Sequence, residues 1–188
     1  MKNTKIVIGF LGEQGAGKGT IVEYIKDAYK ATHFRFSQPL EDILDRLYIA
    51  KSRPNFARLV QMISRGFGDD FLAKTLLRDT EKEKNRLIVI EGIRRWPEVE
   101  ILKRIPTFKM IFITAKEKTR YERIIKRGEK AGETELTFEQ FKEQGKLHTE
   151  KLIKKIGQQA DFQISNDGDL DELHANIESL MSKILPMK

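Results

Sequence analysis

The sequence contains no cysteine and only three histidines in its 188 residues. Disulfide bonds and zinc sites with cysteine ligands are therefore excluded, and a metal centre built on histidine is not expected. This composition fits a reducing, cytoplasmic setting. Long hydrophobic runs are also missing: the stretch from Ile6 to Leu11 is among the longest, whereas a membrane span needs about 18 apolar residues. We therefore expect neither a membrane span nor a targeting segment.

Charged residues make up 34% of the chain and hydrophobic residues 39%, among them 11 phenylalanines. This apolar content is too high for a disordered chain, and the length suits a single domain over residues 1–188. The formal net charge of +7 indicates a polyanionic partner, which can be a nucleotide phosphate, a nucleic acid or an acidic membrane. Charge alone does not distinguish among these partners.

Short apolar runs alternate with segments of helical spacing, which indicates a parallel sheet covered by helices. We expect strands at residues 5–11, 33–36, 87–91, 109–114 and 162–165. We expect helices near residues 18–31, 38–50, 54–66, 69–84, 97–104, 116–128, 138–157 and 169–184. Capping boxes are predicted from Thr114 with Glu117 and from Thr137 with Gln140, and Asp69 is expected to cap the helix that follows it.

A glycine-rich loop at residues 12–20, GEQGAGKGT, is the most informative feature of the sequence. It follows a buried-type strand and opens a helix, which is the setting that a phosphate-binding loop requires. Glycines let consecutive backbone N–H groups face one phosphate, and the helix N-terminus adds partial positive charge. Lys18 can then reach the β- and γ-phosphates of a nucleotide, and the Thr20 hydroxyl can approach a phosphate or Mg²⁺. The alternative is a flexible glycine-rich turn.

In this loop Gly19 follows Lys18, and the threonine comes one place later. The resulting order, G-x-x-G-x-G-K-G-T, resembles adenylate kinase and its nucleoside monophosphate kinase relatives. The resemblance implies ATP and Mg²⁺ as cofactors. It also implies a set of nucleotide-binding loop residues, namely Gly15, Ala16, Gly17, Lys18, Gly19 and Thr20.

The apolar strand at residues 87–91 ends in Glu91, whose carboxylate can hold Mg²⁺, through water or directly. Arg94 would project from the carboxyl end of the sheet, where ligands bind in open α/β folds, and its planar fork can bind phosphate oxygens. The segment EGIRRWPEVE resembles small P-loop kinases, including phage-type deoxynucleoside monophosphate kinases and archaeal dephospho-CoA-kinase-like proteins. Those relatives often have Asp in place of Glu91. The alternative is an ordinary glutamate in solvent.

The segment FRFSQPL at residues 34–40 is similar to the turn that introduces the acceptor site of monophosphate kinases. Further on, the chain resembles the R-x-x-Q…R-x-x-G-x-D pattern of deoxynucleoside monophosphate kinases. Two arginines could pair an acceptor phosphate and a glutamine could read a base edge, although solvated helix faces carry the same residue types. The resemblance implies these acceptor-binding residues: Arg35, Ser37, Arg58, Gln61, Arg65, Asp69 and Arg94.

Arg120, Arg123 and Arg127 are spaced three and four residues apart, so they share one helix face; the alternative is an ordinary solvated basic face. The segment resembles the D-R-I-x-x-R sequence that begins the adenylate kinase lid. By that resemblance Arg123 covers the adenine and Arg127 clamps the transferring phosphates. The polar stretch at residues 128–135 is a candidate mobile lid.

The segment ADFQISNDG at residues 160–168 resembles a turn of dephospho-CoA kinases that lies against the adenine of ATP. The resemblance implies that Asn166 and Gly168 bind the cofactor, although an ordinary turn would have the same composition.

Together these resemblances imply an α/β P-loop kinase fold, a three-layer sandwich around a five-stranded parallel sheet in the order 2-3-1-4-5. Residues 37–84 would form the acceptor region and residues 120–150 the lid. The implied reaction transfers the γ-phosphoryl group of ATP to a small phosphorylated acceptor, a nucleoside or deoxynucleoside monophosphate. The catalytic residues would be Lys18, Arg94, Arg123 and Arg127.

Two alternatives stay open. The first keeps the fold and takes dephospho-CoA or another phosphorylated metabolite as acceptor. The second is a nucleic-acid-associated ATPase or a regulatory nucleotide-binding module, which the charge of +7 would suit. No nucleic-acid-binding motif is found, so neither nucleic acid nor membrane is an expected partner, and the oligomeric state is not indicated.

Overall fold

A computed structural model of the chain describes residues 5–128 and 133–185. Its centre is one five-stranded sheet in the order β2-β3-β1-β4-β5, with every neighbouring pair parallel. The strands are β1 (Ile6–Gly12), β2 (Thr32–Arg35), β3 (Leu87–Glu91), β4 (Phe108–Thr114) and β5 (Phe162–Ser165). The predicted fold class and strand order are therefore confirmed.

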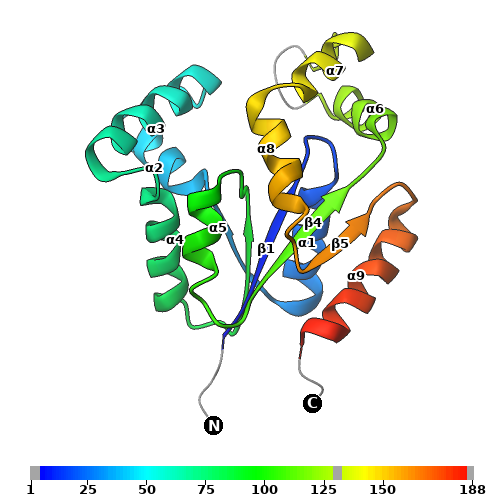
Figure 1. Cartoon of the computed structure of the whole chain (residues 1–188), viewed down its shortest axis with the longest axis horizontal. Helices are drawn as coiled ribbons and strands as arrows, with labels where there is room; N and C mark the ends of the chain where they lie inside the picture. Colours follow the sequence, from blue (N-terminus) through cyan, green and yellow to red (C-terminus); the bar gives the residue numbers. More distant parts are fainter. Residues whose placement is uncertain (1–4, 129–132, 186–188) are drawn as a thin grey trace.

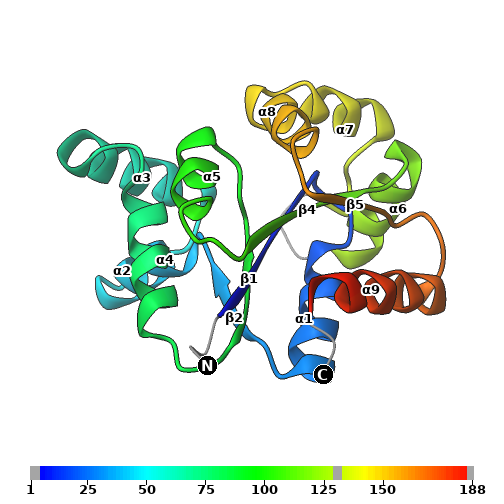
Figure 2. The same cartoon turned by 60° about the horizontal axis from the view of Figure 1, so that its bottom comes forward.

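Helices cover both faces of this sheet, which makes three layers (Figures 1 and 2). They are α1 (Lys18–Tyr29), α2 (Gln38–Arg46), α3 (Arg53–Phe67), α4 (Phe71–Lys82), α5 (Trp96–Leu102), α6 (Glu117–Arg127), α7 (Phe138–Gly145), α8 (His148–Gly157) and α9 (Leu170–Ile184). Alternate residues of β1 enter opposite cores: Val7 packs with α4, α5 and α8, whereas Ile8 packs with α1 and α9. Burial on both faces explains why the central strands are almost continuously apolar.

Three local predictions differ from the structure. The expected helix at 138–157 is two helices, because α7 ends at Gly145 and Leu147 adopts an extended backbone before α8. Helix α4 starts two residues later than expected, so its N-cap is Asp70 and not Asp69. Helix α6 has Lys116 as its N-cap, without a side-chain cap, so the box predicted from Thr114 is wrong.

The capping box of Thr137 and Gln140 is confirmed at the start of α7. Its two hydrogen bonds satisfy backbone N–H groups that the first helical turn leaves without partners.

Because the strands are parallel, their carboxyl ends meet at one edge of the sheet, and two helical regions stand beside that edge (Figure 1). Helices α2 and α3 lie on the β2 side, and α6, α7 and α8 lie on the β4 side. Ligands bind at such an edge in open α/β folds. Within the described ranges, no helix has the length and apolar character needed to cross a membrane.

Candidate functional site

The loop between β1 and α1 has the backbone shape that phosphate binding requires. Gly15 and Gly17 have φ angles of 78° and 92°, in the left-handed region that side chains disfavour. A Cβ atom at Gly17 would also collide with the Asn166 side chain. Helix α1 starts at Lys18, directly after this turn, so its first backbone N–H groups lack helical partners and can face an anion.

The Lys18 ammonium lies against the loop itself. Its Nζ donates to the carbonyl oxygens of Gly12 at 2.7 Å and Glu13 at 2.9 Å. Burial and the nearby positive charge of Arg94 lower the pKa of Lys18 to about 8. Lys18 is therefore still mostly charged at neutral pH but loses its proton at mildly alkaline pH, and a bound phosphate would raise its pKa again.

The four charged groups that influence Lys18 come from three separate segments. Arg94 follows β3 and Arg127 ends α6, and both lower the pKa of Lys18, whereas Glu150 on α8 and Glu91 at the end of β3 raise it. Three residues predicted to act on phosphates, Lys18, Arg94 and Arg127, thus share one region of charge at the edge of the sheet.

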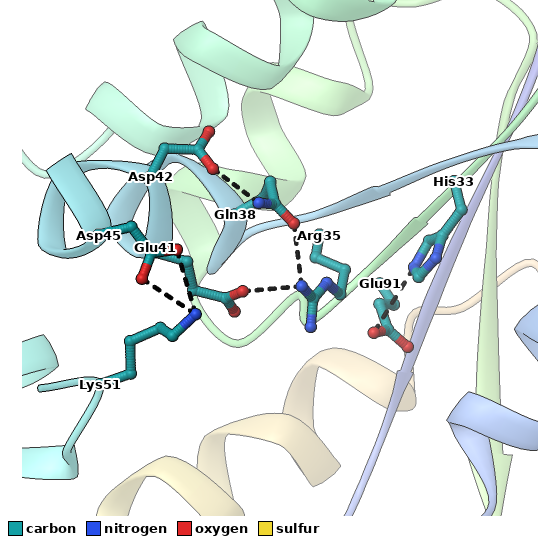
Figure 3. Close-up of polar contacts among 8 residues, drawn as sticks. All are labelled: His33, Arg35, Gln38, Glu41, Asp42, Asp45, Lys51 and Glu91. Atoms are coloured by element: carbon teal, nitrogen blue, oxygen red, sulfur yellow. Dashed lines mark hydrogen bonds and ion pairs between the residues drawn. The ribbon is translucent and has the colours of Figure 1, made fainter.

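Glu91 pairs with a histidine that the sequence did not single out. The Glu91 Oε1 atom lies 3.5 Å from Nε2 of His33 on the neighbouring strand β2 (Figure 3). Burial tends to raise the pKa of Glu91, but the contact and charge of His33, with the charges of Arg35 and Lys18, outweigh it and lower that pKa. Glu91 therefore offers an anionic oxygen, the ligand type that Mg²⁺ prefers, whereas Thr20 lines the cavity at the start of α1.

Arg35 is held by helix α2. One of its terminal nitrogens donates to Gln38 Oε1 at 2.9 Å and to Glu41 Oε2 at 2.8 Å, as Figure 3 shows. Glu41 is mostly buried, with 17% of its side chain exposed. Ser37 is the N-cap residue of the same helix and makes no side-chain cap there.

Arg123 and Asn166 join α6, the end of β5 and the phosphate loop. Arg123 donates to the Asn166 carbonyl oxygen at 2.8 Å, and the Asn166 amide donates to the Ala16 carbonyl oxygen at 2.9 Å. Beside them is a cavity of about 210 Å³ at the start of α1, lined by Gly17, Thr20, Arg123, Asn166, Gly168, Asp169, Leu170 and Leu173. Five of these lining residues belong to the predicted nucleotide-binding set.

Arg120 differs from the other two arginines of α6. Its side chain is 5% exposed and lies 3.0 Å from Glu13 Oε1, inside the phosphate loop. Lys154 Nζ of α8 lies 3.2 Å from the same oxygen. The face that contains Arg120 is therefore not solvated at this position: Glu13 attaches α6 and α8 to the loop.

Arg127 is paired with Glu133, at 3.1 Å from its Oε1 atom, and Gln14 of the phosphate loop donates to the same oxygen at 3.3 Å. Of the candidate lid at 128–135, the structure describes residues 128 and 133–135, and residues 129–132 lie outside the described ranges.

The predicted acceptor residues of α3 stand apart from the site. Arg58, Gln61 and Arg65 are exposed, and in the part of the chain that the structure describes no side-chain hydrogen bond or ion pair involves them. Asp69 is exposed between α3 and α4. The structure therefore groups Lys18, Glu91, Arg94 and Arg127, but it does not bring these four acceptor residues to them through any contact.

Sequence reasoning missed Glu13, His33, Glu150 and Lys154. Glu13 lies within the recognised loop, but its pairing with α6 and α8 depends on residues more than a hundred positions away. The spacing of Glu150 and Lys154, one helical turn apart, was the only local signal for a shared face.

The order of the parallel strands, with a phosphate loop after β1, defines a P-loop kinase-like fold. The chain belongs to the AAA domain family, whose family model matches residues 8–146. A UPF0200 protein of Sulfurisphaera tokodaii is 27% identical over 182 residues, which cover 95% of this chain and 97% of that protein. A UPF0200 protein of Methanothermobacter thermautotrophicus is 24% identical and covers 95% of this chain and 90% of its own length.

Solved structures share the fold. TT1252 from Thermus thermophilus superposes with a TM-score of 0.62 at 17% identity, covering 97% of this chain and 99% of its own. Shikimate kinase from Acinetobacter baumannii, solved in complex with shikimate, superposes with a TM-score of 0.58 at 15% identity. The match covers 98% of this chain and 97% of that one. These likenesses concern the fold alone, so the resemblance to nucleoside monophosphate kinases stays a prediction.

Proposed function

We propose that this protein is a phosphotransferase that uses ATP and Mg²⁺ to phosphorylate a nucleoside or deoxynucleoside monophosphate. The observation that carries the proposal is the joint position of two features around the start of α1. The first feature is the cavity whose lining includes Arg123, Asn166 and Gly168. The second is Lys18, on which the positive charges of Arg94 and Arg127 act. A nucleotide seated in both would have its base in the cavity and its phosphates at the loop.

In this proposal the protein acts by position and charge. Charge in phosphoryl transfer is spread over the phosphate oxygens, so Lys18, Arg94 and Arg127 would stabilise it. Thr20 and Glu91 would hold Mg²⁺, which when bound offsets phosphate charge and orients the phosphate oxygens. Helices α6 to α8, including the lid at 120–150, would exclude water from the site.

The acceptor would bind on the opposite side, in the region of residues 37–84. Arg35, fixed by Glu41 and Gln38, would face the acceptor phosphate at the edge that β2 and β3 share. Arg58, Gln61 and Arg65 would join only after α3 moves towards the sheet, because these side chains are exposed and unpaired within the described residues.

An acceptor panel tests the proposal. ATP, Mg²⁺ and each ribo- and deoxynucleoside monophosphate would be incubated with the protein, together with dephospho-CoA and shikimate, and ADP formation would be measured against a no-acceptor control. We expect one or a few nucleoside monophosphates to accelerate ADP formation. ATP hydrolysis that only DNA or RNA stimulates would contradict the proposal and support the nucleic-acid-associated alternative.

A second candidate is phosphorylation of a hydroxyl group on a small metabolite such as dephospho-CoA or shikimate. The position of Glu91 favours it, because this carboxylate, at the end of β3 and close enough for its charge to act on Lys18, could accept the proton of an attacking hydroxyl. A similar fold is that of the shikimate kinase from Acinetobacter baumannii. The same panel separates this candidate from the first.

The lowered pKa of Lys18 predicts that ATP binding weakens in alkali. A bound phosphate raises that pKa, so above pH 8 the complex holds more protons than the free protein, and raising the pH opposes binding. Between about pH 7.5 and about pH 9.5 we expect the Kd for ATP to rise about tenfold. Calorimetric titrations in buffers of different ionisation enthalpy would measure the affinity and the proton uptake.

Lys18→Arg provides the control, because arginine stays charged throughout this range. Its Kd should be nearly independent of pH. An equal rise of Kd in both proteins would assign the effect to another group.

Replacement of Arg58 and Arg65 by alanine tests the acceptor region. Both side chains are exposed, so we expect the free energy of unfolding to change by less than about 0.5 kcal/mol. Loss of a charged contact to the acceptor phosphate should raise the acceptor KM by about tenfold or more and leave the KM for ATP unchanged. Steady-state kinetics with the best acceptor of the panel measure both constants. Unchanged kinetics would remove these arginines from the acceptor site.

A further inference from the structure

Glu150 on α8 is a largely buried carboxylate beside the phosphate loop, and the proposed transfer gives it no role. Its side chain is 14% exposed. The one ion pair that it forms joins Glu150 Oε1 to Arg94 NH1 across 4.0 Å, and no hydrogen bond to the carboxylate accompanies it within residues 5–128 and 133–185. Buried carboxylates are normally both paired and hydrogen-bonded, so this one is weakly compensated.

The placement of α8 brings this carboxylate over the loop. Ile153 and Ile156 of α8 pack into the core beside β1. Lys154, one turn beyond Glu150, reaches Glu13 inside the loop at 3.2 Å. Glu150 thus pairs with Arg94, and its charge also acts on Lys18; the phosphates of ATP are assigned to both of these cations.

We propose that Glu150 determines the form of the nucleotide that binds, by selecting the magnesium complex of ATP over metal-free ATP. A carboxylate near the phosphate tail repels it, and the repulsion is strong where the surroundings exclude water. The metal-free tail carries about four negative charges and the magnesium complex about two, so repulsion disfavours the metal-free form more. Metal-free ATP, which lacks the ion needed for transfer, would then bind more weakly to the site than Mg·ATP.

This inference rests on the proposed function, since it takes the phosphates of ATP to lie at Lys18. Two other roles for Glu150 predict different results. A direct ligand of Mg²⁺ would strengthen binding of the complex, so its removal would weaken that binding. A purely structural residue of α8 would affect both forms of the nucleotide equally.

Glu150→Gln tests the proposal, because it removes the charge and nearly preserves the shape. Calorimetric titrations would use Mg·ATP, ATP with excess EDTA, and pyrophosphate with EDTA. We expect the variant to bind metal-free ATP and pyrophosphate about tenfold more tightly than the wild type, and Mg·ATP less than about threefold more tightly. Equal changes for both forms, or weaker binding of Mg·ATP, would overturn the proposal.

Glu23→Gln is the control, since Glu23 lies outside the lid, on α1, with 56% of its side chain exposed, and pairs with Lys26. It should bind every ligand as the wild type does. Should Glu150→Gln fail to fold, the wild type can still refute the proposal: a preference for Mg·ATP over metal-free ATP of less than about tenfold would overturn it. A wild type that binds neither form would refute the proposed function itself.

Discussion

Lys18→Ala is expected to reduce the rate of phosphotransfer by about 100-fold or more. The ammonium is held against the loop by two carbonyl oxygens, at 2.7 and 2.9 Å, so it needs little rearrangement to reach a phosphate at the start of α1. Its removal takes away a positive charge beside the phosphate oxygens over which charge is spread during the transfer, and several kcal/mol of stabilisation are lost at this kind of site. Rates would be measured as ADP formation with the best acceptor.

Lys26→Ala on the same helix is the control. Lys26 is 47% exposed and pairs with Glu23 one turn earlier, so its loss should leave the rate within about twofold of the wild type. Thermal unfolding would show that both variants are folded. Near-normal transfer by Lys18→Ala would refute the catalytic assignment of Lys18, and with it the phosphate site at the loop.

Arg120→Met is expected to lower the free energy of unfolding by about 3 kcal/mol. Glu13 and Arg120 are both nearly inaccessible, and their ion pair spans 3.0 Å. Without Arg120, the ion pair that the buried carboxylate of Glu13 keeps within the described residues is with Lys154, whose side chain is 54% exposed and better solvated. Removal of one partner from a buried pair is costly because the remaining charge loses its compensation.

Urea unfolding would measure the effect as a lower midpoint with an unchanged m-value. Lys118→Met, on the same helix, is the control: its side chain is 81% exposed and lies 3.9 Å from Glu122, so a change below about 0.5 kcal/mol is expected. A loss below about 1 kcal/mol for Arg120→Met would mean that Glu13 is compensated without it.

The pairing of Glu13 also bears on function. One carboxylate of the phosphate loop contacts Arg120 of α6 and Lys154 of α8, so the loop and the helices that would close over the nucleotide are linked directly. The same α8 carries Glu150 towards Arg94. A movement of α6 or α8 would therefore change the charges around Lys18, so closure of the proposed lid would alter the electrostatics of the phosphate site.

The sequence by itself determined the features that depend on short stretches of chain. The glycine loop was recognisable because its backbone shape requires glycine at particular places between a strand and a helix. The strands at 87–91 and 162–165 have the bounds that were predicted, since continuous apolar runs bounded by polar residues define buried strands locally. The strand order followed from a resemblance across most of the chain and was confirmed.

Only the tertiary structure decided which charges meet. His33 and Glu91 are neighbours because β2 and β3 pair, and Glu13 meets Lys154 because α8 packs beside β1. The break at Leu147 likewise separates two helices that have one continuous helical pattern in the sequence. Such contacts join residues far apart in the chain, and burial then sets their charge states, so neither the pairing nor the pKa of Lys18 can be obtained from residue types and spacing.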